Sequence, residues 1–233
     1  TVLIYGHYDV QPADPFDEWD SPPFEPTIRD DYIYARGASD MKGQIFAQIK
    51  AMEAVVKHGG IPFNVKYLIE GEEEIGSENL EAFIDANLDL LKCDFVLNTD
   101  AGIYSKDQPG ITYSLRGLAY FEVEVRGPSK DLHSGRFGGT VRNPANELCK
   151  LIAGLHDDDG RVTLPGFYDN VRQLPQEERD DIAKLPYSDQ EWMDMSCSSA
   201  LHGESGFSTL ERVGVRPCLD VNGIWSGFTG EGA

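Results

Sequence analysis

Residues 65–77 read VKYLIEGEEEIGS, an apolar strand pattern that runs directly into four carboxylates within five positions. Alternation of apolar side chains up to Ile69 is typical of a strand that is partly covered by protein. Carboxylates gathered at the end of such a strand repel one another and lose hydration unless a cation or a proton offsets them. The stretch therefore predicts a positive partner nearby, and the alternative is an acidic turn that faces water, as most glutamate runs do.

Two further apolar runs lead into side chains that can bind metals. Residues 2–5 (VLIY) predict a strand covered on both faces, which Gly6 ends before His7 and Asp9. His7 and Asp9 would point to the same side if the chain stays extended, and a carboxylate commonly orients a metal-binding imidazole. A structural histidine is the alternative. Residues 94–99 similarly predict a strand that delivers Asp100 at its end.

Asp40 lies where a helix is expected to begin. Apolar residues recur at helical spacing from Met41 to Val56, and Gly59 and Gly60 end the pattern. Asp40 is then either the N-cap of this helix or a metal ligand, and the residue pattern leaves both open. Ser77 is expected to cap a second helix over residues 80–91.

Strands and helices alternate through the first half, which predicts an α/β fold with a mainly parallel sheet and helices on both faces. Beyond residue 113 the pattern changes, and residues 118–126 alternate as a strand with one wet face. We therefore expect one domain over residues 1–112 and a second, α+β domain over residues 113–233; the family resemblance given below implies that they are the catalytic domain and the lid and dimerisation domain. Within the second domain, Asn143 and Pro144 open a helix, Ser188 and Glu191 can form a capping box, and residues 219–225 predict another strand.

Composition narrows the classes of partner. The 233 residues hold 20 Lys and Arg against 40 Asp and Glu, a formal charge of −20, and no basic run that would follow a phosphate backbone, so no nucleic acid is expected. The four cysteines have no regular spacing, which argues against a thiolate metal site. No apolar run is long enough to cross a bilayer and no targeting pattern opens the chain, so a cytoplasmic protein without a membrane partner is expected.

One histidine among several carboxylates is a ligand set for zinc or manganese, and the excess of carboxylate favours two ions. Two ions that share a carboxylate can polarise a carbonyl and generate hydroxide, and a neighbouring glutamate that is not a ligand can act as general base. The residues themselves therefore point to metal-assisted hydrolysis.

Five ordered motifs carry a family resemblance: HYDVQP (residues 7–12), GASDMKG (37–43), EEIGS (73–77), KDLHSG (130–135) and ERVGVRPCLDVNGIWSGFTGEGA (211–233). Together they closely resemble the dinuclear-metal peptidases that include carnosinase, cytosolic nonspecific dipeptidase, aminoacylase and carboxypeptidase G, and most of all the dipeptidase branch. The resemblance implies hydrolysis of a peptide bond in dipeptides or short peptides with a free carboxylate. The alternatives are deacylation of an N-acyl amino acid by the same mechanism and a non-catalytic binding or dimerisation fragment.

Carried over residue by residue, the resemblance implies two divalent ions, zinc first and manganese as the other candidate, with four ligands: His7, Asp40, Glu74 and Asp100. Asp40 would bridge the two ions. Asp9 would orient the His7 ring, and Glu73 would be the general base that takes a proton from the bridging water and passes it to the leaving amine. Glu70 and Glu72 receive no role and stay candidates for a solvated turn.

The resemblance also places residues of the lid domain at the site. His133 would reach the partner subunit's active site and stabilise the oxyanion, which implies a homodimer through the lid. Asn222 would contact the small peptide substrate. The family's last metal ligand is a histidine that follows the lid, and neither His156 nor His202 lies in a matching context, so the chain is expected to be an internal piece of a longer protein.

Overall fold

The computed structural model describes residues 1–105, 107–228 and 230–231. The chain divides into two compact units, Thr1–Thr112 and Tyr113–Ala233. The first unit contains β1 (Val2–His7), η1 (Phe16–Glu18), β2 (Thr27–Arg29), β3 (Tyr32–Tyr34), η2 (Ala38–Lys42), α1 (Gly43–Lys57), β4 (Val65–Glu70), η3 (Glu73–Ile75), α2 (Leu80–Ala86), α3 (Leu88–Leu91) and β5 (Phe95–Asn98). The second contains α4 (Ser134–Phe137), α5 (Pro144–Ala153), α6 (Gln176–Ile182), α7 (Asp189–Ser196) and α8 (Thr209–Gly214).

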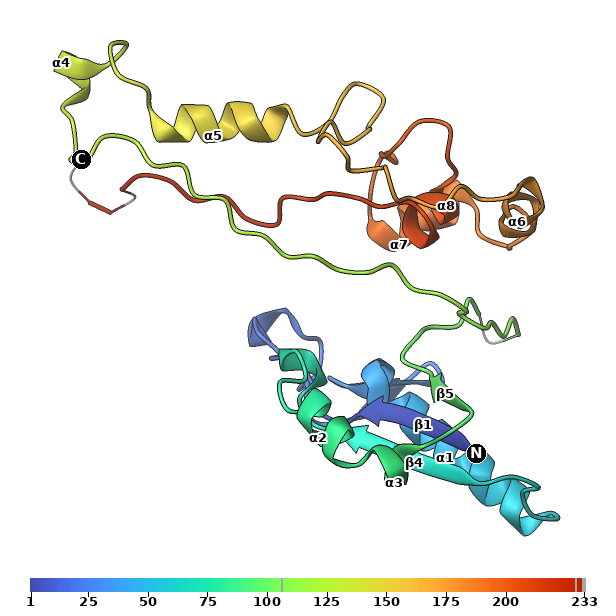
Figure 1. The fold of residues 1–233 in the computed structure, drawn as a ribbon. Helices are drawn as coiled ribbons and strands as arrows, with labels where there is room; N and C mark the ends of the chain where they lie inside the picture. The colour runs from blue at the N-terminus through green and yellow to red at the C-terminus, as the bar shows by residue number, and fades with distance from the viewer. Residues whose placement is uncertain (106, 229, 232–233) are drawn as a thin grey trace. The chain divides into compact units, whose positions relative to one another are not determined.

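The first unit is built on a parallel sheet with the strand order β4-β1-β5. The chain leaves β1 toward β4 and then returns past β1 to β5. Right-handed crossovers in opposite directions put their helices on opposite faces of the sheet. Figure 1 shows α1 on one face and α2 and α3 on the other, which confirms the predicted parallel sheet with helices on both faces.

The register brings the strand ends together. His7 of β1 lies opposite Glu70 of β4, and Tyr5 lies opposite Asn98 of β5. All three strands therefore end at one edge of the sheet, where open α/β folds hold their ligands.

Close packing of α1 on β1 fixes the segment before the helix. A Cβ at Gly6 would lie 2.8 Å from Ile45 Cγ1 and 3.0 Å from Met41 Cε, so a side chain here would force Ile45 or Met41 to shift. Met41 is completely buried and Ile45 is buried in α1. The buried Met41 side chain thereby holds its neighbour Asp40 close to the end of β1.

In the second unit the predicted helix signals are confirmed. Asn143 Oδ1 accepts from Ala145 N at the start of α5, with Pro144 in the first turn. Ser188 and Glu191 form the predicted capping box of α7. A second capping box, between Ser208 and Glu211, opens α8 and was not predicted from the sequence.

The strands predicted over residues 118–126 and 219–225 are wrong for the part of the second unit that the structure describes, where both segments are extended but unpaired. Leu118 is 94% exposed and Trp225 is 81% exposed. Alternation of apolar and polar residues specifies the two faces of a strand, but the strand itself requires a hydrogen-bonded neighbour. The end of the second segment, residues 229 and 232–233, lies outside the described residues.

Within the described ranges, no helix has the length and apolar character needed to cross a membrane. The four cysteines are free thiols.

Candidate metal centre

His7 is the last residue of β1 and is completely buried. Its Nδ1 lies 3.2 Å from the main-chain oxygen of Asp9, which can only accept, so Nδ1 carries a proton. The Asp9 carboxylate also lies near the ring, with Oδ1 3.3 Å from Nδ1. These contacts orient the imidazole so that Nε2 faces away from the strand.

Three carboxylates converge on Nε2 of His7. The nearest oxygens are Asp40 Oδ1 at 3.1 Å, Asp100 Oδ2 at 3.4 Å and Glu73 Oε2 at 3.9 Å. A single proton on Nε2 cannot offset three carboxylates at these distances, and divalent cations bound here would supply the additional positive charge. The positive partner that the sequence predicts for the acidic stretch would therefore lie beside Nε2 of His7.

Asp40 is not the cap of α1, which was one of its two predicted roles. The helix begins at Gly43 after Lys42 and has no side-chain cap. Asp40 itself has extended backbone angles (φ −149°, ψ 102°), and the peptide bond to Met41 is cis. Its side chain is 61% exposed and its carboxylate faces His7 instead of the helix end.

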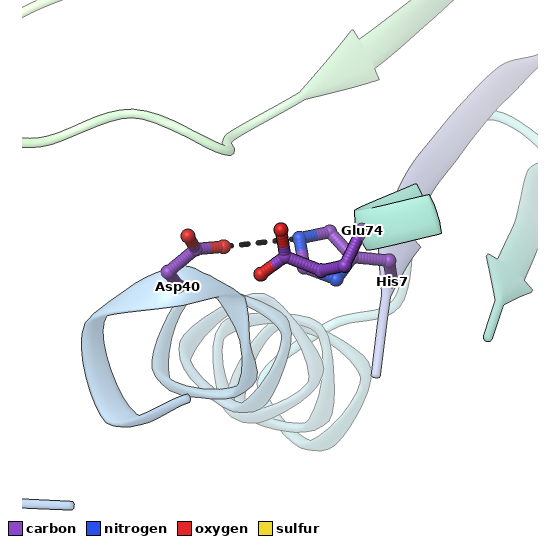
Figure 2. A group of neighbouring side chains, drawn as sticks. All are labelled: His7, Asp40 and Glu74. Carbon is purple, nitrogen blue, oxygen red and sulfur yellow. Dashed lines mark hydrogen bonds and ion pairs between the residues drawn. The ribbon is translucent and has the colours of Figure 1, made fainter. Parts of the chain in front are cut away.

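Glu74 completes a group of three residues that could hold a metal ion. One ligand atom each from His7, Asp40 and Glu74 lie within 4.8 Å of one another. Figure 2 shows the Asp40 and Glu74 carboxylates on the Nε2 side of the His7 ring, with the Asp40 contact drawn as a dashed line. One imidazole nitrogen with carboxylate oxygens suits zinc or manganese, so the donors fit the predicted ions.

The protonation states of the cluster reflect crowded negative charge. Burial raises the pKa of Glu73 above its ordinary value, and Glu74, Asp100 and Asp40 add to this while His7 opposes it. Burial and the Asp40 charge likewise raise the pKa of Asp100. Burial alone would lower the pKa of His7, but the surrounding carboxylates raise it above its ordinary value. All three shifts have the direction expected for carboxylates crowded around one imidazole.

Asp9 links two parts of the centre. Its Oδ2 accepts from the main-chain N of Glu74 at 3.0 Å, while its Oδ1 is buried and makes no hydrogen bond within the described residues. The Asp9 side chain thus ties the η3 turn to the end of β1. It faces both His7 and Glu74, where only the contact with His7 was expected.

The other two glutamates of the acidic stretch are partly exposed, as a water-facing turn would leave them, and both make hydrogen bonds with neighbouring residues. Glu70 Oε1 accepts from Tyr5 Oη and from Ser77 Oγ, the latter at 2.9 Å. Burial and the contact with Glu70 raise the pKa of Tyr5, so it remains a donor. Glu72 accepts from Nδ2 of Asn79 at 2.9 Å.

The same contacts correct the cap predicted for the helix after the acidic stretch. Asn79, not Ser77, precedes α2, and the helix has no side-chain cap. Ser77 instead donates to Glu70 across the turn.

One contact was missed by sequence reasoning. Gln11 Nε2 donates to Glu74 Oε2 at 2.9 Å and to the main-chain oxygen of Glu74 at 3.1 Å. The signal was present, because residues 7, 9 and 11 continue the period-two spacing that was applied to His7 and Asp9.

His133 and Asn222 belong to the second unit, whereas the residues of the metal centre belong to the first. His133 directly precedes α4, and Asn222 lies in the extended segment after α8. Their expected roles stay predictions.

Comparison with known proteins gives a consistent picture. Residues 3–216 match the model of "Peptidase family M20/M25/M40". The chain is 37% identical over 237 residues to the Cys-Gly metallodipeptidase dug1 of Schizosaccharomyces pombe, covering 100% of this chain and 50% of the relative. It is 36% identical over 231 residues to the human Beta-Ala-His dipeptidase, covering 98% of this chain and 46% of the relative.

A solved structure of the same peptidase family also matches the whole chain. The M20 family metallo-carboxypeptidase Sso-CP2 from Sulfolobus solfataricus superposes with a TM-score of 0.82 at 41% identity, over 100% of this chain and 53% of that one. The chain spans about half the length of the curated relatives it matches.

Proposed function

The chain belongs to peptidase family M20/M25/M40, and on this premise we propose that the protein hydrolyses the peptide bond of dipeptides or short peptides that have a free carboxylate. Relatives that match the whole chain are named as dipeptidases, which supports this class of substrate. The observation that carries the proposal is the convergence of three carboxylates on Nε2 of His7 at the carboxyl edge of the sheet.

Four residues would hold two divalent ions, zinc or manganese: His7, Asp40, Glu74 and Asp100. Asp40 is proposed to bridge the ions, since it extends from a separate turn into the space before His7. When bound, the ions would polarise the scissile carbonyl and lower the pKa of a water molecule. The Asp40 side chain is exposed, so this side of the centre leaves room for another group to bind the ions.

Glu73 is the proposed general base. Its carboxylate lies beside the ligands, 3.9 Å from His7 Nε2, and its raised pKa brings proton uptake closer to neutral pH. Glu73 would accept a proton from the attacking water and then transfer it to the amine that leaves. Asp9 would hold His7 in the tautomer that presents Nε2.

The second unit is proposed to act as the lid and dimerisation domain. His133 would stabilise the oxyanion in the active site of the partner subunit, and Asn222 would contact the substrate. Both assignments rest on the motifs KDLHSG and LDVNGIW.

The direct test is dipeptide hydrolysis with and without a chelator, together with Glu73→Gln. General acid–base catalysis contributes about 10²- to 10⁴-fold, so Glu73→Gln should lower kcat by about this factor while zinc still binds. Glu72→Gln is the matched control, because Glu72 is its neighbour but bonds to Asn79. Activity that survives the chelator, or full activity of Glu73→Gln, would refute the mechanism.

The same assay separates the alternatives. A substrate panel that favours N-acyl amino acids over dipeptides would identify a deacylase with the same chemistry. A protein that binds less than one metal ion per chain and hydrolyses neither class would instead have a binding or dimerisation role.

A further inference from the structure

Gln11 lies on the loop after β1, with an exposed side chain that turns back toward the acidic stretch. Within the described part of the chain, its amide nitrogen donates to one residue, Glu74, through both the main-chain oxygen (3.1 Å) and the carboxylate Oε2 (2.9 Å). A side-chain amide has two N–H donors in a fixed planar fork, so one nitrogen can make both bonds. Gln11 thereby joins the backbone of Glu74 to its own carboxylate.

Glu74 is held at three of its polar groups by this short segment. Asp9 Oδ2 accepts from its main-chain N at 3.0 Å, and Gln11 donates to its main-chain oxygen and its carboxylate. A free glutamate side chain samples several rotamers, and each contact reduces that freedom before any ligand arrives. The carboxylate that shares a 4.8 Å cluster with His7 and Asp40 is therefore oriented in advance.

We propose that Gln11 is a positioning residue, whose amide holds the Glu74 carboxylate in the orientation in which it binds a metal ion together with His7 and Asp40. The inference rests on the proposed function, because it requires Glu74 to be a ligand. An amide N–H cannot itself bind a cation, so Gln11 acts through Glu74. A carboxylate oxygen has lone pairs for two partners, and the bond to Oε2 leaves the carboxylate able to bind.

The consequence is measurable as metal affinity. Loss of a group that orients a ligand lowers metal affinity or activity by about 10- to 100-fold. Gln11→Met keeps the length of the side chain and removes both donors. Because Gln11 is exposed, this change should leave the thermal midpoint of the metal-free protein unchanged.

The experiment is calorimetric titration of zinc into the purified, metal-free protein. Gln11→Met should raise the zinc Kd by about 10-fold or more. Asn79→Ala is the matched control, because it also removes an amide bound to a glutamate of the same turn, namely Glu72. Its zinc Kd should equal that of the wild type.

Glu74→Ala separates failure of the inference from failure of the proposed function. If Glu74→Ala weakens zinc binding but Gln11→Met does not, the positioning role is wrong and Glu74 remains a ligand. If Glu74→Ala leaves zinc binding unchanged, Glu74 is not a ligand and both the ligand assignment and the inference are overturned. An equal loss in Asn79→Ala would also overturn the inference, since the effect would then be general to the turn.

Discussion

Glu204 lies in the second unit shortly before α8, and it is the centre of a buried ionic network. Its carboxylate accepts from Arg216 Nε at 2.8 Å and Nη2 at 2.9 Å, and from Arg161 Nη1 at 2.8 Å. Glu204 is 6% exposed, and the Arg216 side chain is 7% exposed. Glu204→Leu would leave the Arg216 guanidinium buried without its counter-ion.

The size of the effect follows from these contacts. Removal of one partner of a buried ion pair costs about 3–5 kcal/mol. Arg216 keeps its stacking on Phe207 at 4.2 Å and on Tyr168 at 5.0 Å in both proteins, so these contacts do not change the difference between them. Arg161 is half-exposed and can return to water. We expect Glu204→Leu to lower the free energy of unfolding of the second unit by about 3–5 kcal/mol.

Urea denaturation combined with hydrogen exchange of the amides of residues 157–216 would measure this loss in the second unit itself. Glu204→Leu with Arg216→Met should recover most of the stability, since apolar groups can replace a buried ion pair at little cost. Asp181→Asn is the control, because its pair with Lys184 is exposed and should contribute nothing measurable. An unchanged urea midpoint for Glu204→Leu would refute the reasoning.

Three other outcomes are expected. Burial alone would raise the pKa of Glu211, but hydrogen bonds from Arg179 and from the α8 cap lower it; ionised Glu211 therefore stabilises the fold above its unfolded pKa. This stability is lost as pH falls through the lower folded pKa, so urea midpoints of wild type and Glu211→Gln should converge at acid pH. A chelator should lower the thermal midpoint of the metal-loaded protein, because metal at 100 times its Kd contributes about 2.7 kcal/mol; an unchanged midpoint would contradict metal binding. In Gly43→Ala the Cβ would lie 2.3 Å from the Ala38 carbonyl oxygen; we expect a loss of about 1–3 kcal/mol in thermal unfolding and weaker zinc binding, because this turn carries Asp40.

The sequence predicted the sheet and the meeting of its strand ends because both follow from local patterns. Apolar runs identified β1 and β4, and parallel strands necessarily end at one edge. His7 and Glu73 could therefore be expected near one another although 66 positions separate them. Whether Asp40 caps a helix or faces His7 could not be decided, since the choice depends on how α1 packs on Gly6.

The ionic network of the second unit could not be predicted for the same reason. Arg161 and Glu204 are 43 positions apart, and neither lies in a periodic pattern. The strand prediction for residues 118–126 failed for the opposite reason. The alternating pattern there is strong, but the segment forms no paired strand in the described part of that unit. Local pattern indicates which face a residue would use, and tertiary contacts decide whether that face is used.

The acidic stretch shows how the two levels combine. Glu70 and Glu72 accept hydrogen bonds from Ser77 and Asn79 of the following turn, so their nearest donors lie outside the metal centre. Glu73 and Glu74 are left to face His7. Charge density alone would assign all four glutamates to one cation. Their contacts instead divide them into two that bond to neighbours outside the centre and two that face it.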